Sequence, residues 1–327
     1  MENNIEKNNL NRFKILLVGA GNLGSRYLQG LLEVKYASSI FVVDCSLKAL
    51  KLCKTRSEEI KNKLHHINYG SSLPENINKF HLAIIATTSK NRASLIKKIY
   101  SKYSVYYWII EKVIAQSVEE LDDIYKLLGN SNNAWVNTPR RIMPWYKEIK
   151  NTIIKEKNKA IQVKIEGGNW GLACNSIHFI DLISWMKNTE VYKIESEEIK
   201  CWISSKREGY MEAIGCLKVS FWDGSFLKLI CLENEEKIKI KFQTLNEIWE
   251  INEDLGIAKG TGNQIIKGQI LLQSKLTSKI VDEILETGKT YLPKLQDSTL
   301  QHIKMIESFL ESWNRIYKKN ATSIKIT

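Results

Sequence analysis

The 327-residue sequence is poor in the features that mark several protein classes. Its six cysteines form no CxxC pair and show none of the close Cys/His spacing that structural zinc requires. Only 8 of its 48 basic residues are arginine, the side chain favoured for bidentate contacts to phosphates and bases. No apolar run approaches the roughly 18 residues that a membrane-spanning helix needs. Despite a net charge of +12, we therefore expect no metal site, no nucleic-acid partner and no membrane partner.

The start of the chain also lacks a targeting signal. Residues 1–12 are polar, without the apolar core of a secretion signal, and we expect them to form a flexible tail. Unpaired cysteines are typical of the reducing cytosol, so the sequence predicts a cytoplasmic protein. Its hydrophobic content of 43% suffices for a packed core, and its length suits two domains.

The first 136 residues alternate between short apolar strands and helices. The apolar run 13–18 stops at Gly19, a helical pattern follows over 22–34, and a second apolar strand covers 40–43. The alternation continues with a helix at 47–63, a strand at 81–86, a helix at 92–100, a strand at 105–110 and a helix at 118–128. This order predicts an α/β domain over 13–136 with a doubly wound parallel sheet of the Rossmann type.

Longer alternating strands dominate the second half. We expect them at 161–166, 199–204, 215–222, 225–232 and 237–243. Asp223 and Gly224 predict a tight hairpin between two of them. With a helix near 145–154, another near 177–186 and late helices around 269–286 and 299–313, these strands predict an α+β domain over 137–327 with a large open antiparallel sheet.

A glycine motif lies between the first strand and the first helix. Gly19, Gly21 and Gly24 fit GxGxxG, and Asn22 and Leu23 complete the loop. In this context the first glycine makes a tight turn, the second lets the backbone approach a pyrophosphate, and the third allows close packing of helix on strand. The free N–H groups at the start of the helix favour an anion. The motif predicts a dinucleotide cofactor.

Asp44 ends the second strand, 20 residues after Gly24. A carboxylate there can accept hydrogen bonds from both ribose hydroxyls and repels a 2′-phosphate. Cys45 and Ser46 bring no cation to offset that repulsion, so we expect NAD rather than NADP. A second interpretation, in which Asp44 caps the helix that begins near Leu47, is compatible with the first.

Together the segments resemble the Gfo/Idh/MocA group of oxidoreductases, named after glucose-fructose oxidoreductase, inositol dehydrogenase and rhizopine catabolism. The similarity is carried by residues 19–24, 86–88, 111–113, 167–168 and 178–181, together with Asn137, Arg141 and Pro144. The resemblance implies a Rossmann domain, a C-terminal domain with an open antiparallel sheet, and hydride transfer between NAD(P) and sugars or cyclitols. It also implies that Thr87, Thr88 and Glu111 lie at the cofactor, and that the protein forms homodimers or homotetramers.

Lys112 is the first candidate catalytic residue. Glu111 and Lys112 resemble the Glu-Lys-Pro signature of the group, whose lysine reaches the substrate hydroxyl and the nicotinamide. Val113 replaces the proline, and because a non-proline cis bond costs about 3 kcal/mol, we expect a loop of different shape. The alternative is that Lys112 is a solvated surface residue.

His178 is the second candidate, because imidazole titrates near neutral pH and oxidation of an alcohol releases a proton. Helical spacing places Cys174, His178 and Asp181 on one face. Where the group commonly has an aspartate, this chain has Cys174, followed by Asn175. Asp181 either orients the imidazole or is a structural partner, and His178 itself has the alternative of a satisfied buried histidine.

Asn169 and Trp170 precede this helix. An aromatic face packs against sugar C–H groups and an amide pairs with hydroxyls, so both are candidates for a sugar pocket, with core packing as the alternative for Trp170. We count Lys112, Cys174, Asn175 and Asp181 with them as candidate substrate contacts.

The sequence therefore predicts an NAD-dependent oxidoreductase acting on a hydroxyl or carbonyl of a sugar, sugar acid or nucleotide sugar. The replaced proline and aspartate keep open an alternative, a dinucleotide- or sugar-binding regulatory protein of the same fold without turnover. We also expect self-association through the C-terminal sheet, because the helices predicted there are too few to cover both of its faces.

Overall fold

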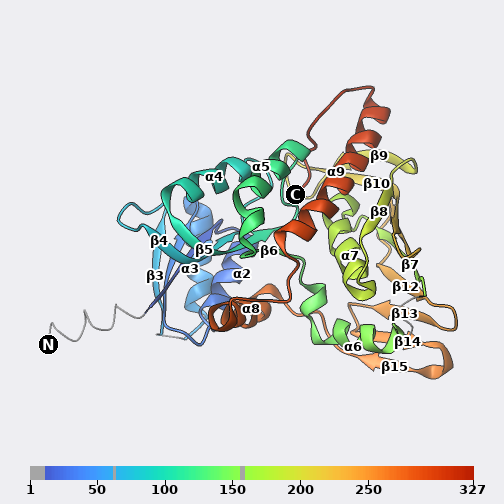
Figure 1. Cartoon of the computed structure of the whole chain (residues 1–327), viewed down its shortest axis with the longest axis horizontal. Helices are drawn as coiled ribbons and strands as arrows, with labels where there is room; N and C mark the ends of the chain where they lie inside the picture. The colour runs from blue at the N-terminus through green and yellow to red at the C-terminus, as the bar shows by residue number, and fades with distance from the viewer. Residues whose placement is uncertain (1–11, 62–63, 155–158) are drawn as a thin grey trace. The chain divides into compact units, whose positions relative to one another are not determined.

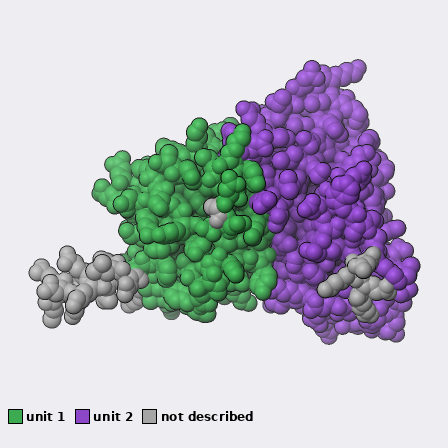
Figure 2. Space-filling view, in the orientation of Figure 1, with its two compact units in different colours: residues 1–111, 124–137, 271–295 green, residues 112–123, 138–270, 296–327 purple. Residues whose placement is uncertain are grey.

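The computed structural model describes residues 12–61, 64–154 and 159–327 (Figure 1). The expected tail over 1–12 lies outside the described residues except for Arg12. The chain divides into two compact units, shown in two colours in Figure 2. Unit 1 contains residues 1–111, 124–137 and 271–295, and unit 2 contains residues 112–123, 138–270 and 296–327.

Unit 1 is built on a six-stranded sheet in the order β3-β2-β1-β4-β5-β6, in which every adjacent pair of strands is parallel. The strands are β1 (Phe13–Val18), β2 (Ser38–Val43), β3 (His66–Gly70), β4 (Lys79–Ile85), β5 (Ser104–Glu111) and β6 (Ala134–Asn137). The order reverses between β1 and β4, which is where such sheets bind ligands at their carboxyl edge. The predicted Rossmann sheet is confirmed, although strand β3, which has no fully buried residue, was missing from the prediction.

The helices of this half are α2 (Asn22–Leu31), α3 (Leu47–Glu58), α4 (Arg92–Lys102), α5 (Val118–Leu128), the 3₁₀ turn η1 (Gly129–Ser131) and α8 (Gln273–Thr287). The position of α8 corrects the expected division at 136/137. We assigned this late helix to the second domain, but it packs against α2 in unit 1. The contact is close because Gly30 has no side chain: a Cβ there would lie 2.5 Å from the Ser274 carbonyl oxygen.

Unit 2 contains a nine-stranded sheet in the order β15-β14-β13-β12-β7-β11-β10-β8, with β9 also paired to β10. The strands are β7 (Gln162–Gly168), β8 (Val191–Glu195), β9 (Ile199–Ser204), β10 (Met211–Phe221), β11 (Phe226–Leu232), β12 (Lys239–Gln243), β13 (Ile248–Asn252), β14 (Ile257–Gly260) and β15 (Ile265–Lys267). The sheet is mixed rather than purely antiparallel, because β7 and β11 run parallel. The Asp223-Gly224 hairpin joins β10 and β11 as expected.

The remaining helices are η2 (Pro139–Ile142), α6 (Pro144–Ile153), α7 (Leu172–Lys187), η3 (Thr261–Asn263) and α9 (Leu295–Tyr317). One face of the nine-stranded sheet carries the core: α7 packs on β10 and β11, and Trp202 of β9 stacks edge-on against Phe309 of α9. The opposite face is polar, as the alternation of exposed Lys239 and Lys241 with buried Ile240 and Phe242 shows. No helix in the described ranges is long and apolar enough to cross a bilayer.

Candidate active site

The glycine loop follows β1 at the carboxyl edge of the parallel sheet. Gly19 has φ +100°, and a Cβ there would lie 2.7 Å from the backbone of Ala86 at the end of β4. A Cβ on Gly24 would lie 1.8 Å from the Gly19 carbonyl oxygen, so only glycine allows α2 to start this close to the turn. Gly21 is different, because no atom lies within 4 Å of the place where its Cβ would be. That open side suits the approach of a pyrophosphate.

Asp44 follows β2 and is tied to the glycine loop. Its Oδ2 accepts a hydrogen bond of 2.7 Å from the Ala20 amide, and its Oδ1 accepts one of 2.8 Å from the Ser46 amide. The cap of α3 is Ser46, whose Oγ accepts from the Ala49 amide, so Asp44 is not the capping residue. Both carboxylate oxygens retain lone pairs for ribose hydroxyls.

Thr87 and Thr88 follow β4 beside the loop. The Thr87 hydroxyl is buried and has no hydrogen-bond partner among the described residues, which leaves it available to a ligand. Arg92 was not among the predicted site residues, yet its buried guanidinium donates to the carbonyl oxygens of Thr87 and Glu111. Arg92 thereby holds together the ends of β4 and β5. A charged residue in the first turn of an amphipathic helix gives no signal of such a role.

Glu111 does not present its carboxylate as expected. Its side chain is 4% exposed, and its Oε1 accepts hydrogen bonds from the Tyr27 hydroxyl at 2.5 Å and from Asn137 Nδ2 at 2.6 Å. This carboxylate joins α2, β5 and β6 inside unit 1, and the place of Glu111 at the cofactor stays a prediction. A buried carboxylate requires such donors to offset its lost hydration.

Lys112 follows β5 directly along the chain and is half-buried. Its Nζ donates to the Cys174 carbonyl oxygen at 3.1 Å and to Asn175 Oδ1 at 3.3 Å, at the start of α7. Asn175 is fixed in turn, since its Nδ2 donates to the Trp170 carbonyl oxygen at 2.8 Å. The Lys112–Val113 peptide bond is cis, although Val113 occupies the proline position. Lys112 is therefore a positioned cation and not a solvated one.

His178 lies one turn further along α7, half-buried, with its Nδ1 atom buried and unpartnered among the described groups. Burial, and then the positive charges of Lys112 and Arg140, lower the pKa of His178 well below 6.5. The ring is therefore neutral at pH 7 and able to accept a proton. An imidazole with an unpaired ring nitrogen does not fit the alternative of a satisfied buried histidine.

Glu212 of β10 is a residue that the sequence analysis missed. Its Oε2 accepts from the Ala173 amide at 2.8 Å and from the Cys174 amide at 3.3 Å, capping the start of α7. It is 9% exposed, and burial raises its pKa while nearby Lys112 opposes the rise. The Cys174 thiol shares a hydrogen bond with it, and burial raises the thiol pKa to about 12. A carboxylate thus lies beside Cys174 after all, supplied by another element.

Asp181 does not orient His178. Its Oδ2 accepts from Thr138 Oγ1 at 2.9 Å, and its Oδ1 lies 3.4 Å from Arg141 in an ion pair. Although helical spacing puts Asp181 on the same face as His178, its carboxylate pairs with Thr138 and Arg141 in the segment before α6. Of the two interpretations of Asp181, the one as a structural partner fits, and the one in which it orients the His178 imidazole is wrong.

The residues before α7 divide into two kinds. Trp170 is 9% exposed, donates from Nε1 to the Ile230 carbonyl oxygen at 2.8 Å and stacks edge-on against Phe179, so it is part of the core. Of the two interpretations of Trp170, core packing therefore fits, and the prediction of a place in a sugar pocket is wrong. Asn169 has φ +43° and a buried Oδ1 without a partner among the described residues, which leaves this acceptor for a ligand. Across the described ranges, no group of three or more His, Cys, Asp or Glu side chains could hold a metal ion.

No family model matches the sequence, and no curated protein matches it either. Solved structures do match. An oxidoreductase from Agrobacterium radiobacter in complex with NAD+, L-tartaric acid and magnesium is similar at 15% identity and TM-score 0.70, over 93% of this chain and 97% of that one. Apo scyllo-inositol dehydrogenase from Lactobacillus casei is similar at 16% identity and TM-score 0.64, over 92% and 97%. The super-repressor mutant of Gal80p from Saccharomyces cerevisiae is similar at 11% identity and TM-score 0.68, over 94% and 96%.

These structures and this chain share a two-unit fold with a parallel Rossmann sheet and a large mixed sheet. It is the fold of the Gfo/Idh/MocA-type oxidoreductases, as the resemblance in the sequence implied.

Proposed function

We propose that the protein is an NAD-dependent oxidoreductase that transfers a hydride between nicotinamide and a hydroxyl or carbonyl carbon of a sugar-like substrate. The observation that carries the proposal is the pairing at the start of α7, where a hydrogen-bonded ammonium lies near a neutral imidazole with an unpaired nitrogen. A protein that only binds ligands has no evident need for a cation and a proton acceptor so close together. The intact glycine loop of unit 1 supplies the accompanying cofactor site.

The residues of unit 1 fit a nicotinamide dinucleotide. The open side of Gly21 and the start of α2 suit the pyrophosphate, Asp44 suits the adenosine ribose, and the buried Thr87 hydroxyl lacks a partner among the described groups. When bound, the nicotinamide supplies or accepts the hydride. The carboxylate of Asp44 favours NAD over NADP, because a 2′-phosphate would meet its negative charge.

His178 takes the proton of the substrate hydroxyl during oxidation and returns it during reduction. The Lys112 ammonium stabilises the negative charge that develops on the substrate oxygen. Asn175 positions Lys112 by accepting one of its hydrogen bonds. Glu212 accepts hydrogen bonds from the Ala173 and Cys174 amides and so positions the first turn of α7.

The substrate class in this proposal is a polyhydroxylated molecule: a sugar, a sugar acid or a nucleotide sugar. The buried Asn169 Oδ1 is an acceptor that a hydroxyl would satisfy. The similar structures point the same way through hydroxylated compounds, L-tartaric acid in one and scyllo-inositol in the name of another. The six free cysteines fit a cytoplasmic location.

The test is turnover with purified protein. The protein is incubated with NAD and a panel of sugars, cyclitols, sugar acids and nucleotide sugars, and absorbance at 340 nm is followed. We expect NADH formation with at least one hydroxylated compound, abolished in the Lys112→Ala variant. Tight NAD binding without turnover on any compound of the panel would contradict the proposal.

That last result would favour a second candidate, a regulatory binding protein of the same fold. One observation supports it: a thiol with a pKa near 12 occupies position 174, where the resemblance leads us to expect a carboxylate. The structural similarity to Gal80p, a protein described by a repressor phenotype, is compatible with it. Calorimetric binding of NAD and a sugar without NADH formation would distinguish this candidate from the enzyme.

A further inference from the structure

A cavity of about 650 Å³ lies entirely within unit 2, at the carboxyl end of α7. Its wall comes from the last turns of α7, the segment that leads into β8, the start of α9 and parts of η2 and α6. Its volume lies within the roughly 300–1,000 Å³ of ordinary small-molecule sites. None of Lys112, Cys174, Asn175 and His178 lines it. Ser184 on its wall lies ten residues after Cys174, about 15 Å further along the helix axis.

Two buried side chains on this wall have unpaired polar atoms. Ser184 of α7 and Gln301 of α9 are each 8% exposed, and neither Ser184 Oγ nor Gln301 Oε1 has a hydrogen-bond partner among the described residues. Burying such atoms unpaired is costly, so they are normally satisfied. The two come from different helices and line one cavity, which indicates a ligand that offers hydroxyl groups: the serine accepts or donates, and the amide oxygen accepts.

The charges on the wall balance. Three cations, Arg141, Lys150 and Lys304, stand with three carboxylates, Asp181, Glu190 and Asp297. All three cations already have protein partners: Arg141 pairs with Asp181 at 3.4 Å, Lys150 Nζ donates to the Trp185 carbonyl oxygen at 2.8 Å, and Lys304 Nζ donates to the Tyr192 carbonyl oxygen at 3.2 Å. A phosphate-bearing ligand would need an excess of positive charge. The balance favours a neutral ligand rich in hydroxyls.

Two tryptophans complete the wall. Trp185 of α7 is half-buried beneath the Lys150 ammonium, which lies 4.2 Å from the ring centroid. Trp222, in the turn after β10, is 67% exposed and is held edge-on by Tyr192 at 4.5 Å between ring centroids. An exposed indole fixed by a neighbouring ring is a surface on which the C–H face of a sugar packs.

We propose that this cavity is a second binding site, for a neutral saccharide of one or two units, separate from Lys112 and His178. Hydroxyls of the saccharide pair with Ser184 and Gln301, while a sugar face packs on Trp222. The proposal does not depend on catalysis, because every residue it uses lies outside the proposed active site.

The experiment measures binding of D-glucose, myo-inositol and maltose by saturation-transfer NMR and calorimetry, without NAD. To remove the contribution of the active site, the Lys112→Ala variant serves as the parent protein. In this background Trp222→Ala and Gln301→Leu are compared with Tyr100→Ala, a matched control that removes an exposed aromatic ring from α4 of unit 1.

We expect at least one probe to bind the Lys112→Ala parent, with affinity at least tenfold weaker in Trp222→Ala and in Gln301→Leu and unchanged in Tyr100→Ala. Because Trp222 is exposed, its removal should leave the melting temperature unchanged. The proposal is overturned if no probe binds the parent at millimolar concentration, or if a probe binds the parent with an affinity that neither Trp222→Ala nor Gln301→Leu changes. The latter result would still leave the proposed catalytic function standing.

Discussion

At the scale of single residues, His178 and Cys174 make opposite predictions. Proton transfer depends on the neutral imidazole, while a thiol with a pKa near 12 is no base at pH 7. We expect His178→Asn to lower kcat by about a hundredfold or more with NAD affinity retained, and Cys174→Ser to change kcat by less than about tenfold. Steady-state kinetics with NAD titrations check both. These roles would be refuted if His178→Asn left kcat unchanged while Cys174→Ser abolished turnover.

The same histidine predicts a pH dependence. Its pKa lies well below 6.5 because burial, Lys112 and Arg140 all disfavour the charged ring. The proposed catalytic base, His178, therefore stays unprotonated as pH falls through 6.5, and kcat/KM should decline only at lower pH. Stability follows the same sign, since unfolding below pH 6.5 releases an imidazole that takes up a proton. A profile of kcat/KM from pH 5 to 8 is the measurement, and an acid limb centred at or above 6.5 that disappears in His178→Asn would count against it.

Asp44 predicts the preference between cofactors. Its carboxylate is fixed by the Ala20 and Ser46 amides, so it cannot easily turn away from a 2′-phosphate. We expect NAD to bind more tightly than NADP, with Asp44→Ala narrowing the difference between them. Calorimetry with both cofactors measures it. Equal or tighter binding of NADP by the unchanged protein would show that the inference is wrong.

At the scale of elements, the glycine loop separates ligand binding from folding. A Cβ on Gly24 meets the Gly19 carbonyl oxygen, whereas one on Gly21 meets no protein atom within 4 Å. Gly24→Ala should therefore destabilise the protein by about 3 kcal/mol or more, as overpacking does. Gly21→Ala should leave the melting temperature unchanged and weaken NAD binding. Thermal unfolding and NAD titration of both variants decide the point, and two variants that behaved alike would contradict it.

The elements that the sequence predicted are those whose pattern is local. The strand before Gly19, the helix over 118–128 and the strand over 199–204 needed only an apolar run or a helical period. The short strands β13, β14 and β15, at one end of the large sheet, were missed because they are brief and partly exposed. The pattern of α8 was recognised, but an amphipathic helix does not specify the sheet on which it packs.

For the candidate active site, too, only residues with a local signal in the sequence could be predicted. The glycine loop and Asp44 were predicted from motif and spacing, Lys112 from the family resemblance, and His178 from the chemistry of its side chain. Glu212 was not, because it reaches the start of α7 only after β10 has paired with its neighbours. Trp170 failed in the opposite way: its residue type fits a sugar pocket, but its position after β7 directs it into the core.

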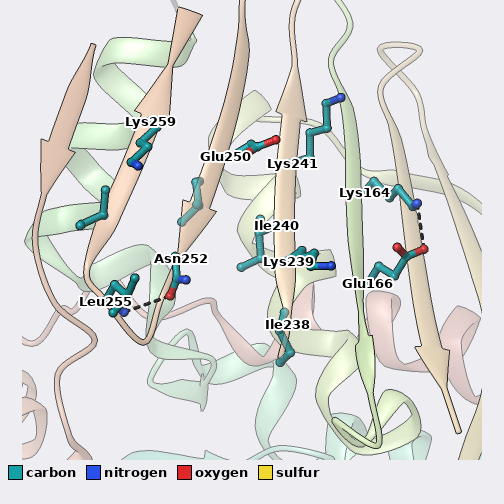
Figure 3. A pocket seen from close by; sticks show the side chains of 12 residues that line it. Lys164, Glu166, Ile238, Lys239, Ile240, Lys241, Glu250, Asn252, Leu255 and Lys259 are labelled. Atoms are coloured by element: carbon teal, nitrogen blue, oxygen red, sulfur yellow. Dashed lines mark hydrogen bonds and ion pairs between the residues drawn. The ribbon is translucent and has the colours of Figure 1, made fainter. Parts of the chain in front are cut away.

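At the scale of the whole molecule, the outer face of the nine-stranded sheet bears on self-association. Figure 3 shows Lys164, Glu166, Lys241, Glu250 and Lys259 on neighbouring strands, with Ile238, Ile240 and Leu255 among them. These side chains line a hollow of about 370 Å³. Lys241 lies opposite Glu250, which lies opposite Lys259 on its other side. A polar face of this kind tolerates water, so the lack of helices does not by itself require a cover. A contact between copies through this face would bring these charged side chains together, beside apolar ones such as the exposed Leu255.

We still expect dimers or tetramers, and this charged face makes their stability depend on salt. Light scattering should give a mass at least twice 37.7 kDa at low ionic strength and a lower mass at about 1 M salt, where charges are screened within about 3 Å. Lys241→Glu should weaken association at low salt. A mass of 37.7 kDa under all conditions would exclude self-association, and a salt-independent oligomer would place the contact elsewhere.

The return of α8 to unit 1 constrains the order in which the protein is made. On the ribosome, all six strands of the parallel sheet emerge before any of residues 138–270, yet the surface of α2 around Gly30 has no partner until residues 271–295 follow. Synthesis of unit 1 therefore begins first and is completed only after the large sheet of unit 2 has been synthesised. Cutting the chain after Asn137 would release a fragment of unit 1 that lacks α8. The two units are therefore interleaved along the sequence and cannot be separated by a single cut.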